Sequence, residues 1–263
     1  MNNFLRALAF CAVLQLFPAP AGAMEPFDVR PPMLNLSFDN GFDDEGPFGF
    51  KAKPSGDEVR LVPARAGKAL FIGGTKDWLE IPLSSAVSLG GGFTLELLVK
   101  RDDWTNPYKG GSGWQTVAAL TTGASLSITA PGCPLHKPWA LQGSVSRYRK
   151  DVQESEHAWV LSAPYGIVPN RWFHAALVYD APDATLELFL DGKLADTAKD
   201  APPPDLNILK LTLGTWYQDN QAFRGYIDEV RVYDRPLRAA ELAARAAAVL
   251  PPPEKPGGKR PAR

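Results

Sequence analysis

Apolar and polar side chains alternate along many short stretches of this chain. Every second residue is apolar in 93–99 and again in 209–213, and each stretch borders on a glycine. Because successive side chains of a β-strand point to opposite sides, this period of two predicts strands with one buried face. Further strands are predicted at 34–38, 67–71, 78–82, 172–180 and 185–190, and near 116–120, 125–130, 139–145 and 158–161.

Turn residues separate these stretches. Asp191-Gly192 directly follows the strand predicted at 185–190 and indicates a tight hairpin, because both central residues of such a turn adopt positive φ. The chain contains 25 prolines and 23 glycines, a composition typical of many short strands joined by turns. Residues 101–114 form a long predicted loop, and loops of this length in compact domains are usually functional or disordered.

The segment 208–233 predicts two strands on either side of a polar, aromatic loop. In the second strand the period of two places Tyr226, Asp228, Val230 and Val232 on one inward-facing side, where a buried carboxylate needs a partner. Beyond it, Asp234 is predicted to cap a short helix that has a proline in its first turn and continues through 239–250.

The Ile-Asp-Glu-Val run at 227–230, with a glycine before it and an aromatic residue and a short helix after it, resembles the closing segment of bacterial laminin G-like domains of the concanavalin A-like jelly-roll superfamily. The similarity extends to Gly-Lys-Ala-Leu at 67–70 and to the hairpin at 172–193. The resemblance implies an all-β fold of two antiparallel sheets packed as a jelly-roll sandwich, with a short C-terminal helix. It also implies that the first and last strands lie side by side.

Composition indicates a single globular domain, and the first residues of the chain indicate export. The 263 residues are 45% hydrophobic and 22% charged, enough for a single core over 24–250. Residues 1–23 have the parts of a secretory signal: a positive Arg6, an apolar run at 7–17 and a small-residue cleavage site at 21–23. The apolar run is shorter than the ~20 residues that a membrane-spanning helix needs. The mature chain is therefore expected to lack a membrane span and to be periplasmic or secreted.

The net charge of the chain bears on which classes of partner it can bind. The formal net charge is −1, so the chain as a whole offers no basic field for nucleic acid. The last residues, 251–263, are rich in proline and glycine and basic, which predicts a disordered tail. The expected partner is a polysaccharide or glycoconjugate, or another envelope or extracellular protein.

The resemblance also implies a metal site. Related jelly rolls often hold a structural Ca²⁺ between the turn after the first strand and the last strand, and the matching residues here are Asp39 and Asp228, with Asp44 as a third candidate. Calcium binds hard oxygen ligands and removes the repulsion between neighbouring carboxylates. The alternative is that Asp228 accepts hydrogen bonds from backbone amides or an arginine, and that Asp43 and Asp44 face water.

Aromatic and polar residues in two predicted loops indicate a sugar-binding surface. Aromatic rings stack on the apolar faces of pyranose rings, while amides and carboxylates bind the hydroxyl groups. The alternative for each ring is a cover over the edge of the core; Trp78, Trp172 and Phe173, in predicted strands, are interpreted as core. The candidate ligand-binding residues are Trp104, Asn106, Tyr108, Trp114, Trp216, Tyr217, Asp219 and Asn220.

Catalytic patterns are not found in the sequence. Laminarinase-type hydrolases need two carboxylates on one strand face, whereas Asp228 and Glu229 are adjacent, Glu96 is solitary and Glu187 is predicted to face outward. The three histidines, at 136, 157 and 174, lack metal-ligand spacing and are interpreted as structural. The sequence thus favours a non-catalytic recognition module for carbohydrate. The alternatives are a protein-interaction or envelope-scaffold domain, and a divergent glycoside hydrolase.

Overall fold

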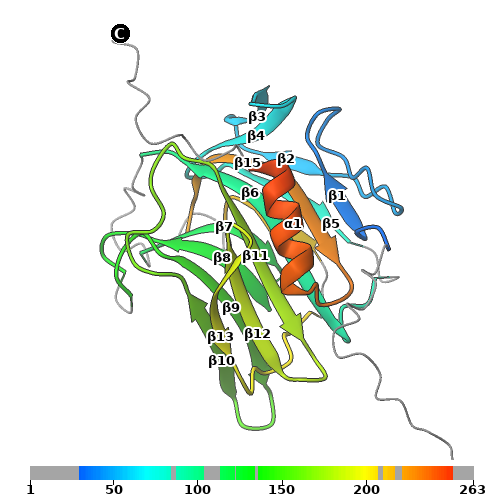
Figure 1. Ribbon diagram of the computed structural model, residues 1–263, viewed down its shortest axis with the longest axis vertical. Helices are drawn as coiled ribbons and strands as arrows, with labels where there is room; N and C mark the ends of the chain where they lie inside the picture. The colour runs from blue at the N-terminus through cyan, green and yellow to red at the C-terminus, as the bar shows by residue number, and fades with distance from the viewer. Residues whose placement is uncertain are drawn as a thin grey trace, which may run out of the picture.

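Two antiparallel β-sheets packed face to face make up this protein, as a computed structural model shows (Figure 1). The structure describes residues 30–83, 87–103, 113–121, 123–133, 136–206, 210–216 and 221–250. It confirms the predicted all-β sandwich with a C-terminal helix. The predicted signal at 1–23 and the predicted tail at 251–263 lie outside the described residues.

The first sheet has eight strands and the second has seven. The first runs in the order β13 (Lys193–Ala198), β12 (Thr185–Leu190), β11 (Phe173–Asp180), β6 (Gly92–Arg101), β15 (Arg224–Tyr233), β4 (Lys68–Gly73) and β3 (Val59–Pro63), and β1 (Leu34–Leu36) also pairs with β15. The second runs in the order β10 (Glu154–Leu161), β9 (Leu141–Arg149), β8 (Ala124–Thr129), β7 (Trp114–Leu120), β14 (Lys210–Leu213), β5 (Trp78–Pro82) and β2 (Lys53–Ser55).

The two ends of the domain meet in the first sheet. β1 pairs antiparallel with β15, with Leu36 opposite Val230, and both side chains are fully buried. On its other side β15 pairs with β6. The expectation that the first and last strands lie side by side is confirmed.

Residues that alternate between apolar and polar in the sequence point alternately to the inner and outer faces of the sheets. Phe93, Leu95 and Leu97 of β6 point into the core between the sheets, as predicted. Close packing across the core depends in part on Gly143 of β9, because a Cβ there would lie 2.3 Å from Cδ1 of Leu177 in the opposite sheet. The predicted hairpin is also present: Asp191 and its following glycine have φ of 52° and 74°, and join β12 to β13.

The predicted phase of β15 is wrong in its first half. A β-bulge interrupts the pairing of β15 with β6 after Asp228, and Glu229 has a φ of 51°. The extra residue shifts the alternation by one position, so that Ile227 and Val230 both point into the core. Tyr226 and Asp228 lie on the outer face instead of sharing the inward side with Val230.

Two of the three aromatic residues interpreted as core are not there. Trp172 lies one residue before β11 and packs on the outer face, with its ring centroid 6.4 Å from that of Tyr226. Trp78 is half-buried in β5, in alternation with the core-facing Leu79. Phe173 does lie in the core.

Helix α1 (Ala239–Val249) covers part of the outer face of the eight-stranded sheet (Figure 1). Leu242 packs beside Tyr233 and Phe189 in a second, smaller apolar cluster. The hydroxyl of Thr94 on β6 donates to the carbonyl of Arg235 (2.9 Å) and accepts from the backbone N–H of Leu237 (2.8 Å), which fixes the segment leading into the helix.

The predicted start of the helix is wrong by several residues. Arg238 is the N-cap residue, and its backbone N–H donates to the carboxylate of Glu241 (3.1 Å). Asp234, the predicted cap, lies outside the helix with its carboxylate 3.8 Å from the guanidinium of Arg30. No helix among the described residues has the length and apolar character needed to cross a membrane.

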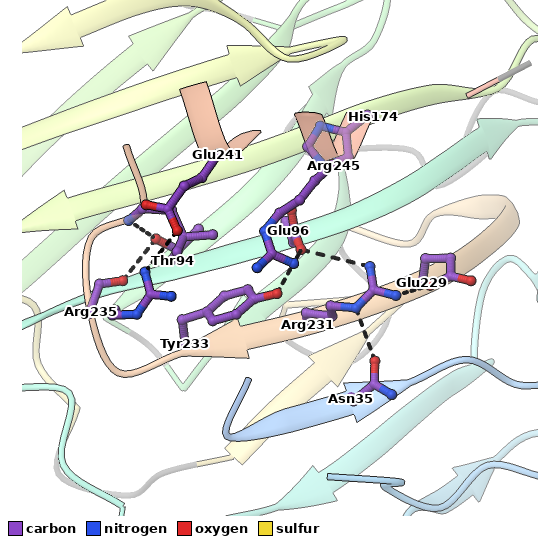
Figure 2. Close-up of polar contacts among 11 residues, drawn as sticks. Asn35, Thr94, Glu96, His174, Glu229, Arg231, Tyr233, Arg235, Glu241 and Arg245 are labelled. Carbon is purple, nitrogen blue, oxygen red and sulfur yellow. Dashed lines mark hydrogen bonds and ion pairs between the residues drawn. The ribbon is translucent and has the colours of Figure 1, made fainter. Parts of the chain in front are cut away.

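A buried carboxylate connects α1 to the sheet beneath it (Figure 2). Glu96 of β6 has a side chain that is 1% exposed. It accepts a hydrogen bond from the Tyr233 hydroxyl (3.1 Å) and lies 3.2 Å from Nε2 of His174. The guanidinium groups of Arg245 on α1 and Arg231 on β15 lie 3.5 and 3.8 Å away. One carboxylate therefore joins β6, β11, β15 and α1.

Burial and the neighbouring charges determine which of Glu96 and Tyr233 carries a proton. Burial alone would raise the pKa of Glu96, but the hydrogen bond and charge of His174, together with Arg245 and Arg231, hold that pKa below its ordinary value. Burial and then the charge of Glu96 raise the pKa of Tyr233. The carboxylate is thus ionised and Tyr233 keeps its proton, which makes Tyr233 the donor.

Removal of this carboxylate should strongly destabilise the fold. Glu96→Ala leaves two arginines and the Tyr233 hydroxyl without their shared acceptor, and loss of one partner of a buried charge cluster costs about 3–5 kcal/mol. Urea denaturation should show this loss. Glu187→Ala, a half-buried glutamate on the same sheet, is the matched control and should change the free energy of unfolding by at most about 0.5 kcal/mol. Similar losses for both variants would contradict the proposed role of the cluster.

Candidate functional site

A groove of about 180 Å³ lies on the outer face of the seven-stranded sheet. Its walls are serines, glutamines and aromatic rings, and we call it the serine groove. Its lining residues are Trp114, Ser125, Ser127, Gln142, Ser144, Ser146, His157, Trp159, Trp216 and Gln221.

Strand alternation produces the floor of the serine groove. On β9, Leu141 and Val145 point into the core, whereas Gln142, Ser144 and Ser146 line the groove. The serines of β8 alternate with core residues in the same way. One side of each strand thus supplies the core, and the other supplies a row of small polar groups.

Strand register places these polar groups next to one another. Ser144 of β9 pairs with Trp159 of β10 on one side and with Ser125 of β8 on the other. Two residues further along β8, Ser127 lies between Gln142 of β9 and Thr116 of β7. The groove therefore crosses four adjacent strands, β10, β9, β8 and β7.

Hydrogen bonds between side chains organise the floor. The hydroxyls of Ser125 and Ser144 lie 2.9 Å apart. Thr116 donates its hydroxyl proton to Oε1 of Gln221 (2.7 Å), so in its 3.0 Å contact with Ser127 it must accept. The floor is polar, and its hydroxyls both donate and accept.

Three indole rings stand around this floor. The N–H of Trp114 donates to Oε1 of Gln142 (2.6 Å), which fixes the ring at one side. Trp159 is 44% exposed, and its ring stacks on His157 with centroids 5.7 Å apart. The indole N–H of Trp216 is buried and has no acceptor among the described residues. The groove thus offers exposed ring surface.

The structure brings together two of the residues predicted to bind ligand, Trp114 and Trp216. These two residues are about a hundred positions apart in the sequence, and they lie close together because β7 pairs with β14. The other six, which lie outside the described residues, are Trp104, Asn106, Tyr108, Tyr217, Asp219 and Asn220.

Most residues of the groove were not predicted from the sequence. The predicted ligand-binding residues were expected in loops, whereas Trp159 and His157 lie within β10, and the serines and Gln142 lie within β8 and β9. The alternation of Gln142 and Ser144 with core residues was a usable signal for a polar sheet face. His157 was interpreted as structural, but it is exposed at the groove, while His174 contacts Glu96 inside the fold.

The described lining of the serine groove contains no carboxylate. Glycoside hydrolysis uses two carboxyl groups on either side of the scissile bond. The buried Glu96 cannot serve, because the cluster beneath α1 encloses it. The groove's chemistry is that of stacking and hydrogen bonding.

Asp44, one of the three predicted metal ligands, serves the backbone. Its carboxylate accepts hydrogen bonds from the N–H groups of Asn35 (2.8 Å), Gly46 (2.7 Å) and Phe50 (3.2 Å). It is buried, in contrast to the alternative that it faces water. These bonds fix the turn after β1.

Asp39 and Asp228, the other two, are electrostatically coupled. Asp39 accepts the N–H of Lys68 (2.8 Å) and Asp228 that of Glu229 (2.9 Å). Burial first, and then the neighbouring charges of Glu229 and Asp39, raise the pKa of Asp228 to about 7. No group of three or more His, Cys, Asp or Glu residues suited to a metal occurs in the described ranges. The pair fits Ca²⁺ only with oxygens from backbone or water, because that ion takes about six to eight ligands.

Asp228 also borders a cavity of about 110 Å³ on the outer face of the eight-stranded sheet. The cavity lies between the Ala64–Ala66 turn, Trp172 and the C-terminal end of α1 at Val249. Asp228 faces this cavity because it points to the outer face of the sheet, directly before the bulge in β15. The Asp228 carboxylate is thus nearly buried, and a small ligand such as an ion in the cavity could contact it.

Comparison with known protein families gives one match over residues 73–243, to a laminin G-type model described as the concanavalin A-like lectin/glucanases superfamily. No curated protein matches the chain.

Among solved structures, the botulinum neurotoxin serotype C1 binding domain is similar, with 14% identity and a TM-score of 0.62 over 82% of this chain and 52% of that one. The binding domain of botulinum neurotoxin DC in complex with SialylT has 13% identity and a TM-score of 0.62, over 82% and 51%. A structure of botulinum neurotoxin type C, whose cell entry depends on interaction with two ganglioside molecules, has 14% identity and a TM-score of 0.61, over 82% and 51%. The chain spans about half the length of these structures, and at such identities the likeness shows the fold alone.

The raised pKa of Asp228 predicts a pH dependence of stability in metal-free protein. Between about pH 4 and pH 7 the folded state holds a proton on Asp228 that the unfolded state has lost, since the ordinary pKa is 3.8. Stability contributed by this proton is present below pH 4 and is lost as pH rises through 7. Thermal unfolding in chelator should show wild type losing stability relative to Asp228→Asn over this range. A constant difference between the two proteins would contradict the assignment.

Proposed function

The chain belongs to the concanavalin A-like lectin/glucanases superfamily, and on this basis we propose that it is a non-catalytic recognition module that binds a carbohydrate or glycoconjugate in the serine groove. The observation that carries the proposal is the combination of three indole rings with a floor of hydroxyl and amide groups in one groove. Rings of this kind stack on pyranose faces, and the floor groups bind hydroxyls. The absence of carboxylates from the described lining favours binding over hydrolysis.

Two similar structures support the class of ligand. The binding domain of botulinum neurotoxin DC is in complex with SialylT, and cell entry of botulinum neurotoxin type C depends on two ganglioside molecules. Both are ligands of those toxins. Because only the fold is shared at this identity, the ligand of the present chain is argued from its own groove.

We further propose that recognition takes place outside the cytoplasm, in the periplasm or after secretion. The support is the sequence of residues 1–23, with its positive charge, apolar run and small-residue cleavage site. Extracellular and envelope glycans would then be the available ligands.

A structural calcium ion is the second part of the proposal. Asp39 and Asp228 would hold it, with one oxygen of each carboxylate already oriented by a backbone N–H. The ion would supply positive charge that keeps Asp228 ionised, which burial and the charges of Glu229 and Asp39 otherwise oppose. Asp44, whose oxygens accept three backbone hydrogen bonds, is left out of this site.

Calcium should raise the melting temperature of wild-type protein, and chelator should reverse the effect, because an ion that binds only the folded state stabilises it. Asp228→Asn should abolish the response. Asp43→Asn is the control, because Asp43 is an exposed carboxylate of the same turn that pairs with Lys51. A melting temperature indifferent to calcium, or an equal response in Asp228→Asn, would exclude this site.

Trp159→Ala and Trp114→Ala should each weaken glycan binding by about fivefold or more, since aromatic stacking contributes about 1 kcal/mol beyond area burial. A glycan array identifies a binding oligosaccharide, and calorimetry then compares the variants. Trp172→Ala is the control, because this indole lies on the outer face of the other sheet. Equal binding by all four proteins, or loss only in Trp172→Ala, would refute the groove as the binding site.

A further inference from the structure

The described lining of the serine groove contains no lysine, arginine, aspartate or glutamate. Its polar atoms belong to serine hydroxyls, glutamine amides, a histidine ring and indole N–H groups. From this composition we infer that the groove selects uncharged sugar units and discriminates against sialylated and other anionic glycans. The inference rests on the proposed function and specifies the ligand class of the same site.

The floor suits a neutral sugar better than an anion because its hydroxyls occur in donor and acceptor pairs. The hydroxyls of Ser125 and Ser144 lie 2.9 Å apart and either can donate, whereas Ser127 donates to Thr116 (3.0 Å) because Thr116 donates to Gln221. A sugar hydroxyl also donates and accepts, so it can serve either role beside Ser125 and Ser144. A carboxylate only accepts, and it needs a cation or several N–H donors to offset its lost hydration.

The aromatic rings add to the discrimination. The face of an indole ring carries the negative part of its quadrupole, which attracts C–H groups and cations and repels anions. Trp159 offers such a face beside Ser144, because the two residues pair across β10 and β9. A negative sugar at this position would lie near both an unfavourable ring face and a floor without positive charge.

Two lysines elsewhere in the sandwich have partners of their own. Lys210 lies on β14 in the same sheet, but its ammonium group is 2.8 Å from the carboxylate of Glu80. Lys100 lies on the opposite side of the sandwich, with its ammonium 4.0 Å from the ring centroid of Tyr226. An anionic glycan in the groove would therefore lack a direct partner among these groups.

The size of the groove indicates a short epitope. Its volume of about 180 Å³ is below that of sites that enclose a drug-sized ligand, about 300–1,000 Å³. From β10 to β7 it crosses three strand spacings, or about 14 Å. The inferred ligand is therefore a few neutral sugar units at the end or side of a longer glycan.

The test compares neutral oligosaccharides with acidic counterparts. Tetragalacturonic acid is compared with its methyl ester, which has the same sugar configuration without the negative charges, and N-acetyllactosamine is compared with its sialylated form, by calorimetry on the full mature chain. The neutral member should bind at least about tenfold more tightly, the loss expected for a charge buried without a partner. Its affinity should also be insensitive to salt, because no ion pair forms.

His157→Arg supplies the complementary variant. His157 is exposed at the groove, so an arginine there is compatible with folding and adds the missing positive charge. The ratio of sialylated to neutral affinity should rise by about tenfold or more in this variant.

The outcomes separate the two claims. If anionic members bind as tightly as neutral ones and Trp159→Ala abolishes both, the groove is a glycan site and the inferred selectivity is wrong. If no member of any pair binds, the proposed function and the inference fail together.

Discussion

One constraint governs this molecule: the strands that form the two sheets must place one row of apolar side chains in the main core between them. Leu36 and Val230 meet there from the two ends of the domain, and Gly143 and Leu177 meet there from opposite sheets. Once the inner side of each strand is committed to the core, its outer side is available for polar groups. The functional surfaces of this protein are the outer sides of strands whose inner sides form the core.

The two outer faces are used differently. On the eight-stranded sheet, α1 packs beside β11 and β13, and the charge of Glu96 is buried next to two arginines (Figure 2). On the seven-stranded sheet, the corresponding side of β8 and β9 carries hydroxyls and amides without charge, and indole rings border them. A buried charge with fixed partners suits a structural role, whereas neutral hydroxyls that can both donate and accept hydrogen bonds suit the binding of a sugar.

Local alternation predicted the strands well because the core demands it directly, as at Phe93 and Leu95, and the Asp191-Gly192 turn was equally local. The phase of Asp228 was not predictable, because one residue with positive φ at Glu229 reverses the alternation. The partners of Glu96 were hidden for another reason: His174 and Arg245 are distant in sequence and meet it only through the register of β11 and the docking of α1. The groove was missed because its residues are spread over strands, and only their pairing makes them one surface.

The central claim, that the serine groove binds sugar, is tested most directly by nuclear magnetic resonance of the seven indole N–H groups during titration with a neutral oligosaccharide. The account predicts that the signals of Trp114, Trp159 and Trp216 shift together with increasing sugar, while that of Trp172 on the opposite face stays in place. Shifts confined to Trp172, or no shift of the three groove signals at sugar concentrations that saturate the protein, would contradict it.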